Sequence, residues 1–316
     1  MKKPYVCVIG GSNVDITCTT FTKIKTKDSN PGVTSLSCGG VSRNIAENLA
    51  RLGLNVVLIT VLGTDFNAHM IEQNALSVGI DLSHSLVVDE PSSCYVSVND
   101  VDNDMFVGVA SMGILDKLTP EFLAKNLDVI NGAQCVVTDT NIPNCLDFLI
   151  ENVKVPIFLD TVSAKKTVIA NDKIKNLHCI KPNEYEAEIL SGIEVKDEKS
   201  ALAACKVIAQ RNIDTIFVSC GEKGSYCYNN GNFTHVPFYK TDVKNTTGAG
   251  DSFMSGIVYG FAKGMSAESS AAFAAACATI TVSSIDTVCK ELSAEKALEI
   301  VNKNGVKQAI FYSKNQ

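Results

Sequence analysis

The sequence predicts an α/β protein in which a mostly parallel sheet lies between two layers of helices, a three-layer α/β/α sandwich. Short apolar, β-branched runs alternate with helical patterns through most of the 316 residues. This alternation is typical of parallel strands joined by right-handed crossover helices. The strand candidates are apolar at successive positions, as strands that are buried on both faces must be.

Six apolar runs are predicted as strands, and the segments between them have the periodicity of helices. The predicted strands are Tyr5–Ile9, Val56–Val61, Cys135–Thr138, Ile157–Asp160, Cys179–Lys181 and Thr215–Ser219. The predicted helices are Val41–Leu52, Asp65–Val78, Pro120–Val129, Glu184–Leu190 and Lys199–Arg211.

Two stretches, approximately residues 14–37 and 92–110, break this alternation. The first is polar and rich in Thr and Lys, and the other has the pattern of two strands around a polar turn at 99–104. Both are predicted to be antiparallel strands outside the main sheet, where together they form a small β-sheet lid. With this lid included, residues 1–316 are predicted to be a single domain.

Composition excludes several classes of partner. The chain is 46% hydrophobic and 20% charged with a net charge of −6, and its basic residues are scattered. We therefore expect neither a nucleic-acid footprint nor binding to an anionic membrane surface.

The cysteines and the apolar segments indicate a cytoplasmic protein. The 12 cysteines form no CxxC pair and lie mostly in apolar runs, which is typical of buried thiols in a reducing compartment. The four histidines are dispersed, so no zinc site is expected. The apolar run near the N-terminus is too short for a signal peptide, and residues 271–285 are too short and polar to span a bilayer.

The strongest chemical signal is the segment 245–251, which reads NTTGAGD and precedes a small-residue apolar helix predicted from Ser252 to about Ala262. A glycine-rich turn at a helix N-terminus exposes backbone N–H groups where the helix dipole adds positive charge. Gly248 and Gly250 would let that backbone approach an anion closely. The segment therefore predicts a phosphate cradle.

Asp251 would repel a phosphate at this position, so its presence needs a reason. One interpretation is a general base that accepts the proton of an attacking hydroxyl while the amides hold the phosphoryl group. The other is a helix cap, which is a common use of Asp. The residues alone leave the two interpretations evenly balanced.

Two common nucleotide motifs are absent. No GxxxxGK[ST] sequence is present, and residues 10–13 after the first strand read GGSN rather than GxGxxG. A dinucleotide-binding dehydrogenase is therefore only a third alternative.

A further group of polar residues lies near the N-terminus. Asn44 lies near the start of a predicted helix, after Gly39 and Gly40, and its amide could bond a ligand hydroxyl or simply satisfy the backbone. Asn13 and Asp15 follow the first strand, and the carboxyl ends of parallel strands line ligand crevices. These residues are candidates for binding sugar hydroxyls.

These segments together resemble the ribokinase-like (PfkB) family of carbohydrate and nucleoside kinases over nearly the whole chain. Residues 39–53, with the pattern GG…N…A…L…RLG, are similar to the first signature of the family, and TGAGD at 247–251 is similar to the second and more specific one. Residues 183–186 (NEYE) are similar to the NxxE motif that acts on magnesium and phosphate. Residues 219–224 (SCGEKG) are similar to a turn on the nucleotide side.

The resemblance implies an ATP-dependent kinase of ribokinase-like fold with Mg²⁺ as cofactor, and it assigns roles to individual residues. Asp251 would be the catalytic base, and the N–H groups of Thr247, Gly248, Ala249 and Gly250 would form the anion hole. The acceptor would be held by Asn13, Asp15, Gly39, Gly40, Arg43 and Asn44. ATP would be held by Asn183, Ser219, Gly221, Gly224 and Gly248, with the helix around 274–282 near adenine. Asn183 and Glu186 would act on the metal mainly through waters.

Within the family, three strings favour one acceptor. Residues 39–48, 99–102 and 160–163 are similar to the versions in members that phosphorylate the 5′-hydroxyl of pseudouridine. Lys166 follows at a distance where it could face the phosphates or lie on the surface. Many relatives have Asp in place of Asn245, where it helps bind a monovalent cation, so the absence of that charge leaves cation dependence open.

Other interpretations stay open. The acceptor could be ribose, adenosine, inosine or a hexose, and a non-catalytic nucleoside-binding protein could use the same fold. In several members the lids pair, and the resemblance extends that expectation to a homodimer through the lid.

Overall fold

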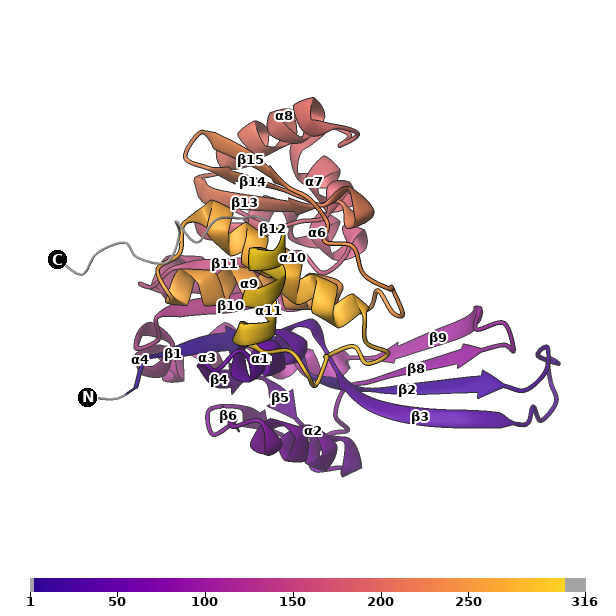
Figure 1. Ribbon diagram of the computed structural model, residues 1–316. Helices are drawn as coiled ribbons and strands as arrows, with labels where there is room; N and C mark the ends of the chain where they lie inside the picture. Colours follow the sequence, from indigo (N-terminus) through magenta and orange to yellow (C-terminus); the bar gives the residue numbers. More distant parts are fainter. Residues whose placement is uncertain (1–2, 305–316) are drawn as a thin grey trace.

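The computed structural model describes residues 3–304, and a nine-stranded sheet, the main sheet, runs through the molecule (Figure 1). Its strands, in order across the sheet, are β15 (Asn232–Val236), β14 (Ser225–Asn229), β13 (Ile213–Ser219), β12 (Leu177–Lys181), β11 (Ile157–Asp160), β10 (Cys135–Asp139), β1 (Tyr5–Ile9), β4 (Asn55–Ile59) and β6 (Ile80–Asp81). The pairs from β13 to β6 are parallel, and β14 and β15 add an antiparallel hairpin. The predicted mostly parallel sheet is confirmed, although the hairpin was not predicted.

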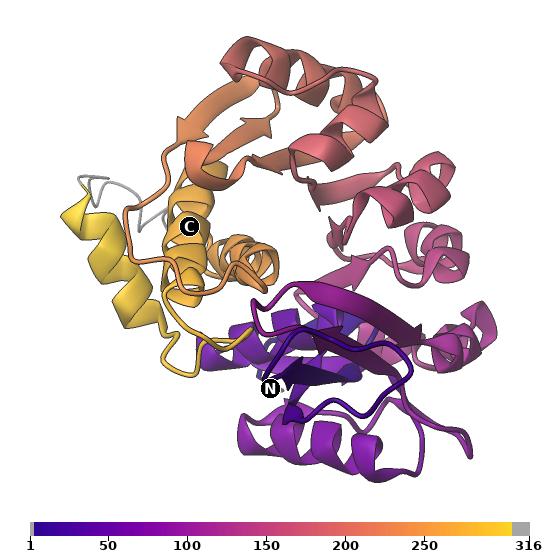
Figure 2. The same ribbon diagram turned by 90° about the vertical axis from the view of Figure 1, so that its right-hand side faces the viewer.

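Successive side chains of the central strands enter two different cores, as the period of a strand requires. Val6 and Val8 point into one core, whereas Cys7 and Ile9 point into the other, and all four are fully buried. The first face is covered by α1 (Val41–Arg51), α9 (Ala249–Ala262), α10 (Ala267–Val282) and α11 (Ala294–Lys303). The second is covered by α3 (Pro120–Lys125), α4 (Leu127–Asn131), α5 (Pro143–Asn152), α6 (Ala164–Ala170), α7 (Glu184–Ser191) and α8 (Glu198–Ala209). The predicted three layers are visible in Figure 2.

Two predicted elements are interrupted. The predicted helix 120–129 breaks at Asn126, whose side chain donates to the Phe122 carbonyl at 3.2 Å and so competes with the helix backbone. The predicted strand 56–61 ends as β4 at Ile59, and β5 (Val61–Leu62) pairs instead with β7 (Leu86–Val87). A further helix, α2 (Phe66–Ser77), packs beside β6.

Four strands form a second sheet, the small sheet, which projects from the main body (Figure 1). Its order is β3 (Gly32–Gly39), β2 (Asn13–Thr20), β8 (Cys94–Asn99) and β9 (Met105–Ser111). Each of the two predicted segments forms an antiparallel hairpin, but the hairpins meet through a parallel β2–β8 pair. The expectation of antiparallel pairing throughout was wrong at this seam, because β2 and β8 run in the same direction there.

Two further expectations concern the cysteines and the apolar helices. All 12 cysteines are free thiols, and most are buried; Cys18, Cys38 and Cys94, in the small sheet, are partly exposed. Across residues 3–304, every helix is too short or too polar to cross a bilayer.

Candidate functional site

The predicted phosphate cradle lies at the N-terminus of α9. Gly248 caps this helix in the left-handed conformation (φ 80°), and a Cβ there would stand 2.0 Å from the Thr287 carbonyl oxygen. Only glycine fits such a position without moving the backbone. A Cβ on Gly250 would stand 3.1 Å from the Lys181 ammonium, so this turn also lies directly against a buried cation.

The amides of the cradle are not equivalent. The N–H of Thr247 already donates to Asn245 Oδ1 at 2.9 Å, and that of Ala249 donates to the Thr246 carbonyl at 3.3 Å. The N–H groups of Gly248 and Gly250 have no acceptor within residues 3–304. Of the four amides predicted to form the anion hole, those of Gly248 and Gly250 are thus unpaired within the described residues, whereas those of Thr247 and Ala249 are engaged.

Asp251 lies in the first turn of α9 and links this helix to α1. Its Oδ2 accepts a hydrogen bond from Asn44 Nδ2 at 2.7 Å, and the residue is half-buried rather than sealed in the core. The cap of α9 is Gly248, without any side-chain cap, so the helix-cap interpretation of Asp251 is wrong.

The charge of Asp251 is finely balanced. Burial raises the pKa of its carboxyl to about 7, and the Asp160 carboxylate contributes to the increase. The hydrogen bond from Asn44 and the positive charges of Lys181 and Arg43 act in the opposite direction. A carboxyl with a pKa near neutrality is well suited to accept a proton at physiological pH.

The predicted acceptor residues meet where the small sheet leaves the main body. Asn13 Nδ2 donates to Asp15 Oδ1 at 2.6 Å, and Asn13 lies opposite Gly39 in the β2–β3 pair. A Cβ on Gly39 would stand 2.1 Å from Asp15 Oδ2, and Gly40 has a φ of 98° with the Gly11 carbonyl 2.5 Å from its Cβ position. Both glycines are therefore needed to bring α1 and Asp15 together.

Arg43 does not fit its predicted role in direct acceptor binding. Its side chain is almost fully buried and bonds Glu47, the Asn74 side chain at 3.1 Å and the Cys38 carbonyl at 2.7 Å. It also donates to Asn44 Oδ1. The guanidinium therefore orients the amide of Asn44, which in turn contacts Asp251.

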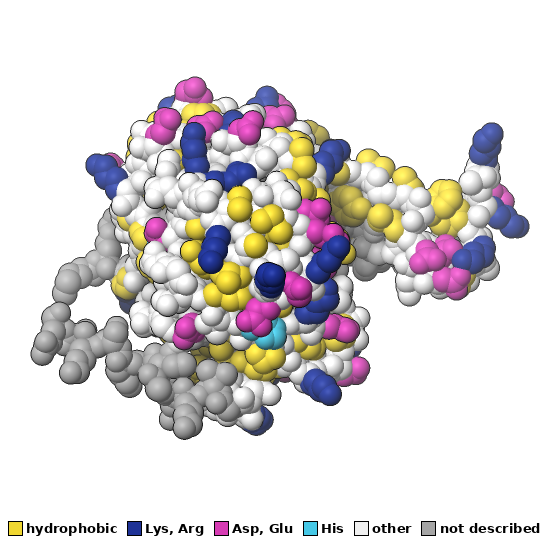
Figure 3. All heavy atoms as spheres, turned by 90° about the horizontal axis from the view of Figure 1, so that it is seen from above, with side chains coloured by type: hydrophobic (Ala, Val, Ile, Leu, Met, Phe, Trp, Pro, Cys, Tyr) yellow, Lys and Arg dark blue, Asp and Glu magenta, His cyan; other side chains and the backbone are white. Residues whose placement is uncertain are grey.

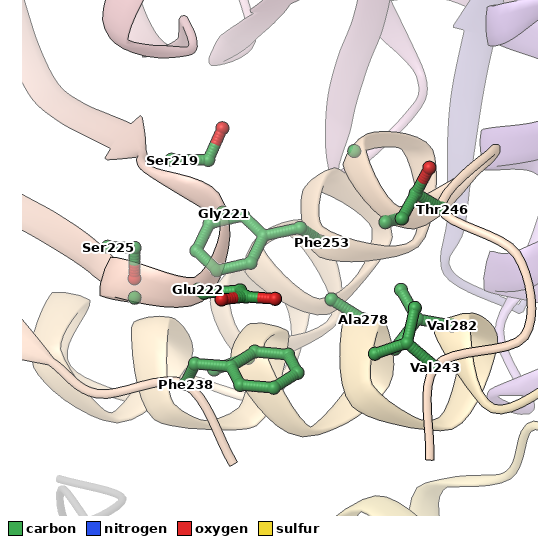
Figure 4. Close-up of a pocket in the computed structure, with 14 residues that line it drawn as sticks. Ser219, Gly221, Glu222, Ser225, Phe238, Val243, Thr246, Phe253, Ala278 and Val282 are labelled. Carbon is green, nitrogen blue, oxygen red and sulfur yellow. The ribbon is translucent and has the colours of Figure 1, made fainter. Parts of the chain in front are cut away.

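A cavity of about 290 Å³ adjoins the cradle (Figure 4). The predicted residues Ser219, Gly221 and Gly224 line it together with Ala249 and Gly250 of the cradle. Gly224 has a φ of 87°, and a Cβ there would stand 2.2 Å from the Val236 carbonyl. The predicted nucleotide-side turn and the cradle thus line the same cavity.

The walls of this cavity are mostly apolar, with Glu222 and a few hydroxyl groups among them. Phe238, Val243 and Phe253 face it with residues of α10, of which Ala278 and Val282 are labelled in Figure 4. A mostly apolar space that ends at backbone amides suits a planar base carrying a phosphate tail. Sequence reasoning predicted the α10 wall but missed Phe238, Val243 and Phe253. The first two lie in the loop 237–247 between β15 and α9, where isolated apolar residues were the available signal.

Asn183 and Glu186 form a reciprocal capping box at the start of α7. Asn183 Oδ1 accepts from the Glu186 N–H at 2.9 Å, and Glu186 Oε2 accepts from the Asn183 N–H at 2.8 Å. Thr161 Oγ1 also donates to Glu186 Oε2 at 2.5 Å. Within residues 3–304 no group of three His, Cys, Asp or Glu side chains could hold a metal. Because the polar groups of Asn183 and Glu186 are engaged with each other in the capping box, these residues fit contact with a hydrated ion through its waters.

Two other predicted positions have local roles. Asn245 Nδ2 donates to the Ile285 carbonyl at 3.0 Å, and Asn245 Oδ1 accepts from the Thr247 N–H. The amide therefore holds the loop before α9 against the segment that follows α10. A carboxylate at this position could not make the first of these bonds. Lys166 lies half-exposed on α6 and forms no ion pair within the described chain.

Sequence reasoning missed one buried pair at the site. Lys181, at the end of β12, lies 3.1 Å from the Asp160 carboxylate at the end of β11. Burial alone would lower the pKa of Lys181, but the carboxylates of Asp160 and Glu186 raise it above its ordinary value, so the ammonium stays charged. The available signal for Lys181 was the sequence KPN at 181–183, in which a lysine stands two residues before Asn183.

The sequence and the fold were both compared with those of known proteins. Residues 3–293 match the pfkB family of carbohydrate kinases. The chain belongs to this family. The pfkB-family chain is therefore a phosphotransferase whose acceptor is a hydroxyl group.

Individual pfkB-family relatives cover nearly the whole chain. A pseudouridine kinase of Escherichia coli K12 is 33% identical over 304 residues, which are 95% of this chain and 97% of the relative. A ribokinase of Haemophilus influenzae is 26% identical over 87% of this chain and 91% of its own. The ribokinase of Arabidopsis thaliana, solved with ribose and ATP, has the same fold, with a TM-score of 0.85 and 23% identity over 94% of this chain and 98% of that one.

Proposed function

We propose that this kinase transfers the γ-phosphoryl group of ATP to the 5′-hydroxyl of pseudouridine, giving pseudouridine 5′-phosphate and ADP. The observation that carries the transfer step is the Asn44–Asp251 hydrogen bond at the N-terminus of α9. This bond joins a predicted acceptor residue on α1 to the proposed base on α9, whose first turn carries the Gly248 and Gly250 amides that are unpaired within residues 3–304. The acceptor itself is suggested by the 33% identity to a pseudouridine kinase over nearly the full length of both chains.

The residues suggest a direct in-line transfer. Asp251 accepts the proton of the acceptor hydroxyl as the oxygen attacks the γ-phosphorus, and the bond from this phosphorus to the oxygen of the leaving ADP breaks. The N–H groups of Gly248 and Gly250 donate hydrogen bonds to the oxygens of the transferring phosphoryl group, on which negative charge develops. Asn44 fixes the carboxylate, and Arg43 fixes Asn44.

ATP and Mg²⁺ fit the remaining part of the site. The apolar cavity between Phe238, Phe253 and α10 would take the adenine, and the turn at Gly221 and Gly224 would pass the phosphates to the cradle. Mg²⁺ supplies neutralisation of phosphate charge in kinases. Asn183 and Glu186 would meet its hydration shell, because their own hydrogen-bonding groups are already engaged in the capping box.

The small sheet supports a nucleoside rather than a bare sugar. Cross-strand partners share a face, and Asp15 lies in register with Ser37 and Tyr95, while Thr17 lies in register with Ser35 and Ser97. This face, the hydroxyl face, extends the polar surface beyond Asp15 along the sheet. Hydroxyl groups both donate and accept hydrogen bonds, as the polar edge of a nucleobase requires.

An acceptor screen tests this proposal. ADP release with Mg·ATP is measured for pseudouridine, uridine, adenosine, inosine, ribose and fructose, and the products are identified by ³¹P NMR. We expect the highest kcat/KM for pseudouridine, with uridine as the matched N-linked control. A higher kcat/KM for ribose, adenosine, inosine or the hexose would replace pseudouridine as the acceptor. Nucleoside binding without ADP release would favour the non-catalytic alternative.

The opposite face of the small sheet supports a homodimer. It carries Ile16, Leu36, Val96, Val107 and Val109, which are cross-strand or diagonal neighbours, and the last two are 44% and 58% exposed. Figure 3 shows hydrophobic side chains along this projecting sheet. We expect light scattering to give twice the chain mass for the wild type and a single chain mass for Val109→Lys. A monomeric wild type at micromolar concentration would reject the dimer.

A further inference from the structure

The ion pair of Asp160 and Lys181 lies next to the transfer site and has no part in the steps described above. Their side chains are 4% and 6% exposed, and within residues 3–304 the Lys181 ammonium is the only partner of Asp160 Oδ2. A buried ion pair is weak evidence for a stabilising role, because desolvation opposes the attraction. The pair therefore calls for a reason at this particular place.

The backbone that holds Asp160 is strained. Val162 has a φ of 63°, which is a rare conformation for a β-branched residue. Its N–H donates to Asp160 Oδ1 at 2.8 Å, and the Ser163 N–H donates to the Thr161 carbonyl at 2.7 Å across the same turn. Such strain persists where the surroundings enforce it, and it is concentrated at functional sites.

The charged groups around Asp251 come from three elements. Asp160 at the end of β11 is the negative one, whereas Lys181 on β12 and Arg43 on α1 are positive. Arg43 is already paired with Glu47. Lys181 is therefore the cation that balances Asp160 at this point, and its Nζ lies 3.1 Å from the Cβ position of Gly250, the residue before Asp251.

We propose that Asp160 and Lys181 are positioning residues for Asp251, a charge-neutral pair that the strained turn at Val162 holds beneath the cradle so that Asp251 stays ionised. The proposal rests on the proposed function of Asp251 as the base. Without Lys181, the Asp160 carboxylate would face Asp251 uncompensated, and like charges disfavour ionisation. Without Asp160, the lysine would favour the ionised base more strongly.

A set of charge variants tests the pair. Lys181→Met should lower kcat at pH 7 by about tenfold or more, with KM for ATP and acceptor changed less than about threefold, since a shift of one pKa unit changes the ionised fraction up to tenfold. The double variant Asp160→Asn/Lys181→Met should recover most of this loss, because it removes both charges. Lys173→Met, a partly buried lysine paired with Asp147 on another part of the surface, is the matched control and should leave kcat unchanged.

A further readout needs no substrate, so it separates this inference from the proposed function. NMR of ¹³C-carboxyl-labelled aspartate in the ligand-free protein follows the titration of Asp251. Its midpoint should rise in Lys181→Met, fall in Asp160→Asn and return close to the wild-type value in the double variant. If Lys181→Met does not fold, Asp160→Asn and the double variant still decide the question. An Asp251 midpoint that is unchanged in Asp160→Asn overturns the proposal, even where turnover falls.

The turn is tested by relieving its strain. Val162→Gly should fold at least as stably as the wild type but lower kcat, because Asp160 is held less firmly. Asn230→Gly is the control: it relieves a positive φ of 47° in the β14–β15 hairpin and should not affect kcat. Unchanged kcat and Asp251 titration in Val162→Gly would show that the strained turn does not serve the site.

Discussion

The two sheets of this kinase use similar β-branched residues but lie in opposite environments. β10 in the main sheet is buried at every position, whereas β9 in the small sheet is exposed at every position. Helices cover both faces of the main sheet, so its side chains supply stability and a rigid support for Asp251 and the cradle. The small sheet is less covered, and its faces are the ones that we propose for an acceptor and a partner chain. The site lies at their junction, where Asp251 comes from the body and Asp15 from the small sheet.

The largest expected effect comes from replacing Asp251, the residue that the main sheet and its helices contribute to the site. Asp251→Asn should lower kcat by about 10²–10⁴-fold, because it deletes the proposed base, while the fold is retained. Steady-state ADP release at saturating ATP and acceptor measures the loss, with thermal unfolding as the check on folding. Turnover near the wild-type value would show that the body does not supply the base.

Matched leucine substitutions compare the stability of the two sheets. Leu58 in β4 is fully buried, so Leu58→Ala should lower the free energy of unfolding by about 2–5 kcal/mol. Leu36 in β3 is 46% exposed, so Leu36→Ala should change it by less than about 0.5 kcal/mol. Urea unfolding of both variants measures the difference. Equal losses would mean that the small sheet is covered in solution, as a stable dimer would require.

The small sheet should control acceptor use. Asp15→Ala removes a carboxylate that bonds Asn13 and faces the acceptor residues, so KM for the acceptor should rise by about 10–100-fold with a smaller effect on KM for ATP. Initial rates with each substrate varied in turn separate the two constants. Asp102→Ala, in the turn at the tip of the sheet, is a control for loss of an acidic residue there. A rise in KM for ATP alone would place Asp15 outside the acceptor site.

The smallest expected effect is a pH dependence of kcat/KM that arises from Asp251. The pKa of Asp251 is raised to about 7, so kcat/KM should fall about tenfold between pH 8 and pH 6 as the base becomes protonated. The same shift acts on stability. Because the folded pKa lies above the unfolded one, the contribution of this carboxyl is present below about pH 3.8 and is lost as pH rises through about 7. The Tm advantage of Asp251→Asn over the wild type should therefore grow from pH 4 to pH 8, and a constant difference would contradict the raised pKa.

Local sequence patterns predicted the elements well because the periodicity of burial lies within short windows. β1 and β11 begin and end at the predicted residues, whereas α9, predicted from Ser252, already begins at Ala249 within the cradle and ends at Ala262 as predicted. The pattern could not find the break at Asn126, because it depends on the side chain of that residue choosing a backbone carbonyl. It also could not give the parallel β2–β8 seam, since strand direction depends on how two distant hairpins meet.

The sequence by itself determined the alternation of strands and helices in the main sheet, the glycine-rich turn before Asp251, and the family to which these motifs belong. Only the tertiary structure decided which charges meet. It buried Arg43 behind Asn44, placed Lys181 beside Gly250, and engaged the amide of Thr247 while those of Gly248 and Gly250 find no acceptor in the described part of the chain. The physical reason is that hydrophobic periodicity is a property of neighbouring residues, whereas the pairing of charges across about 70 to 210 positions exists only after the chain has packed.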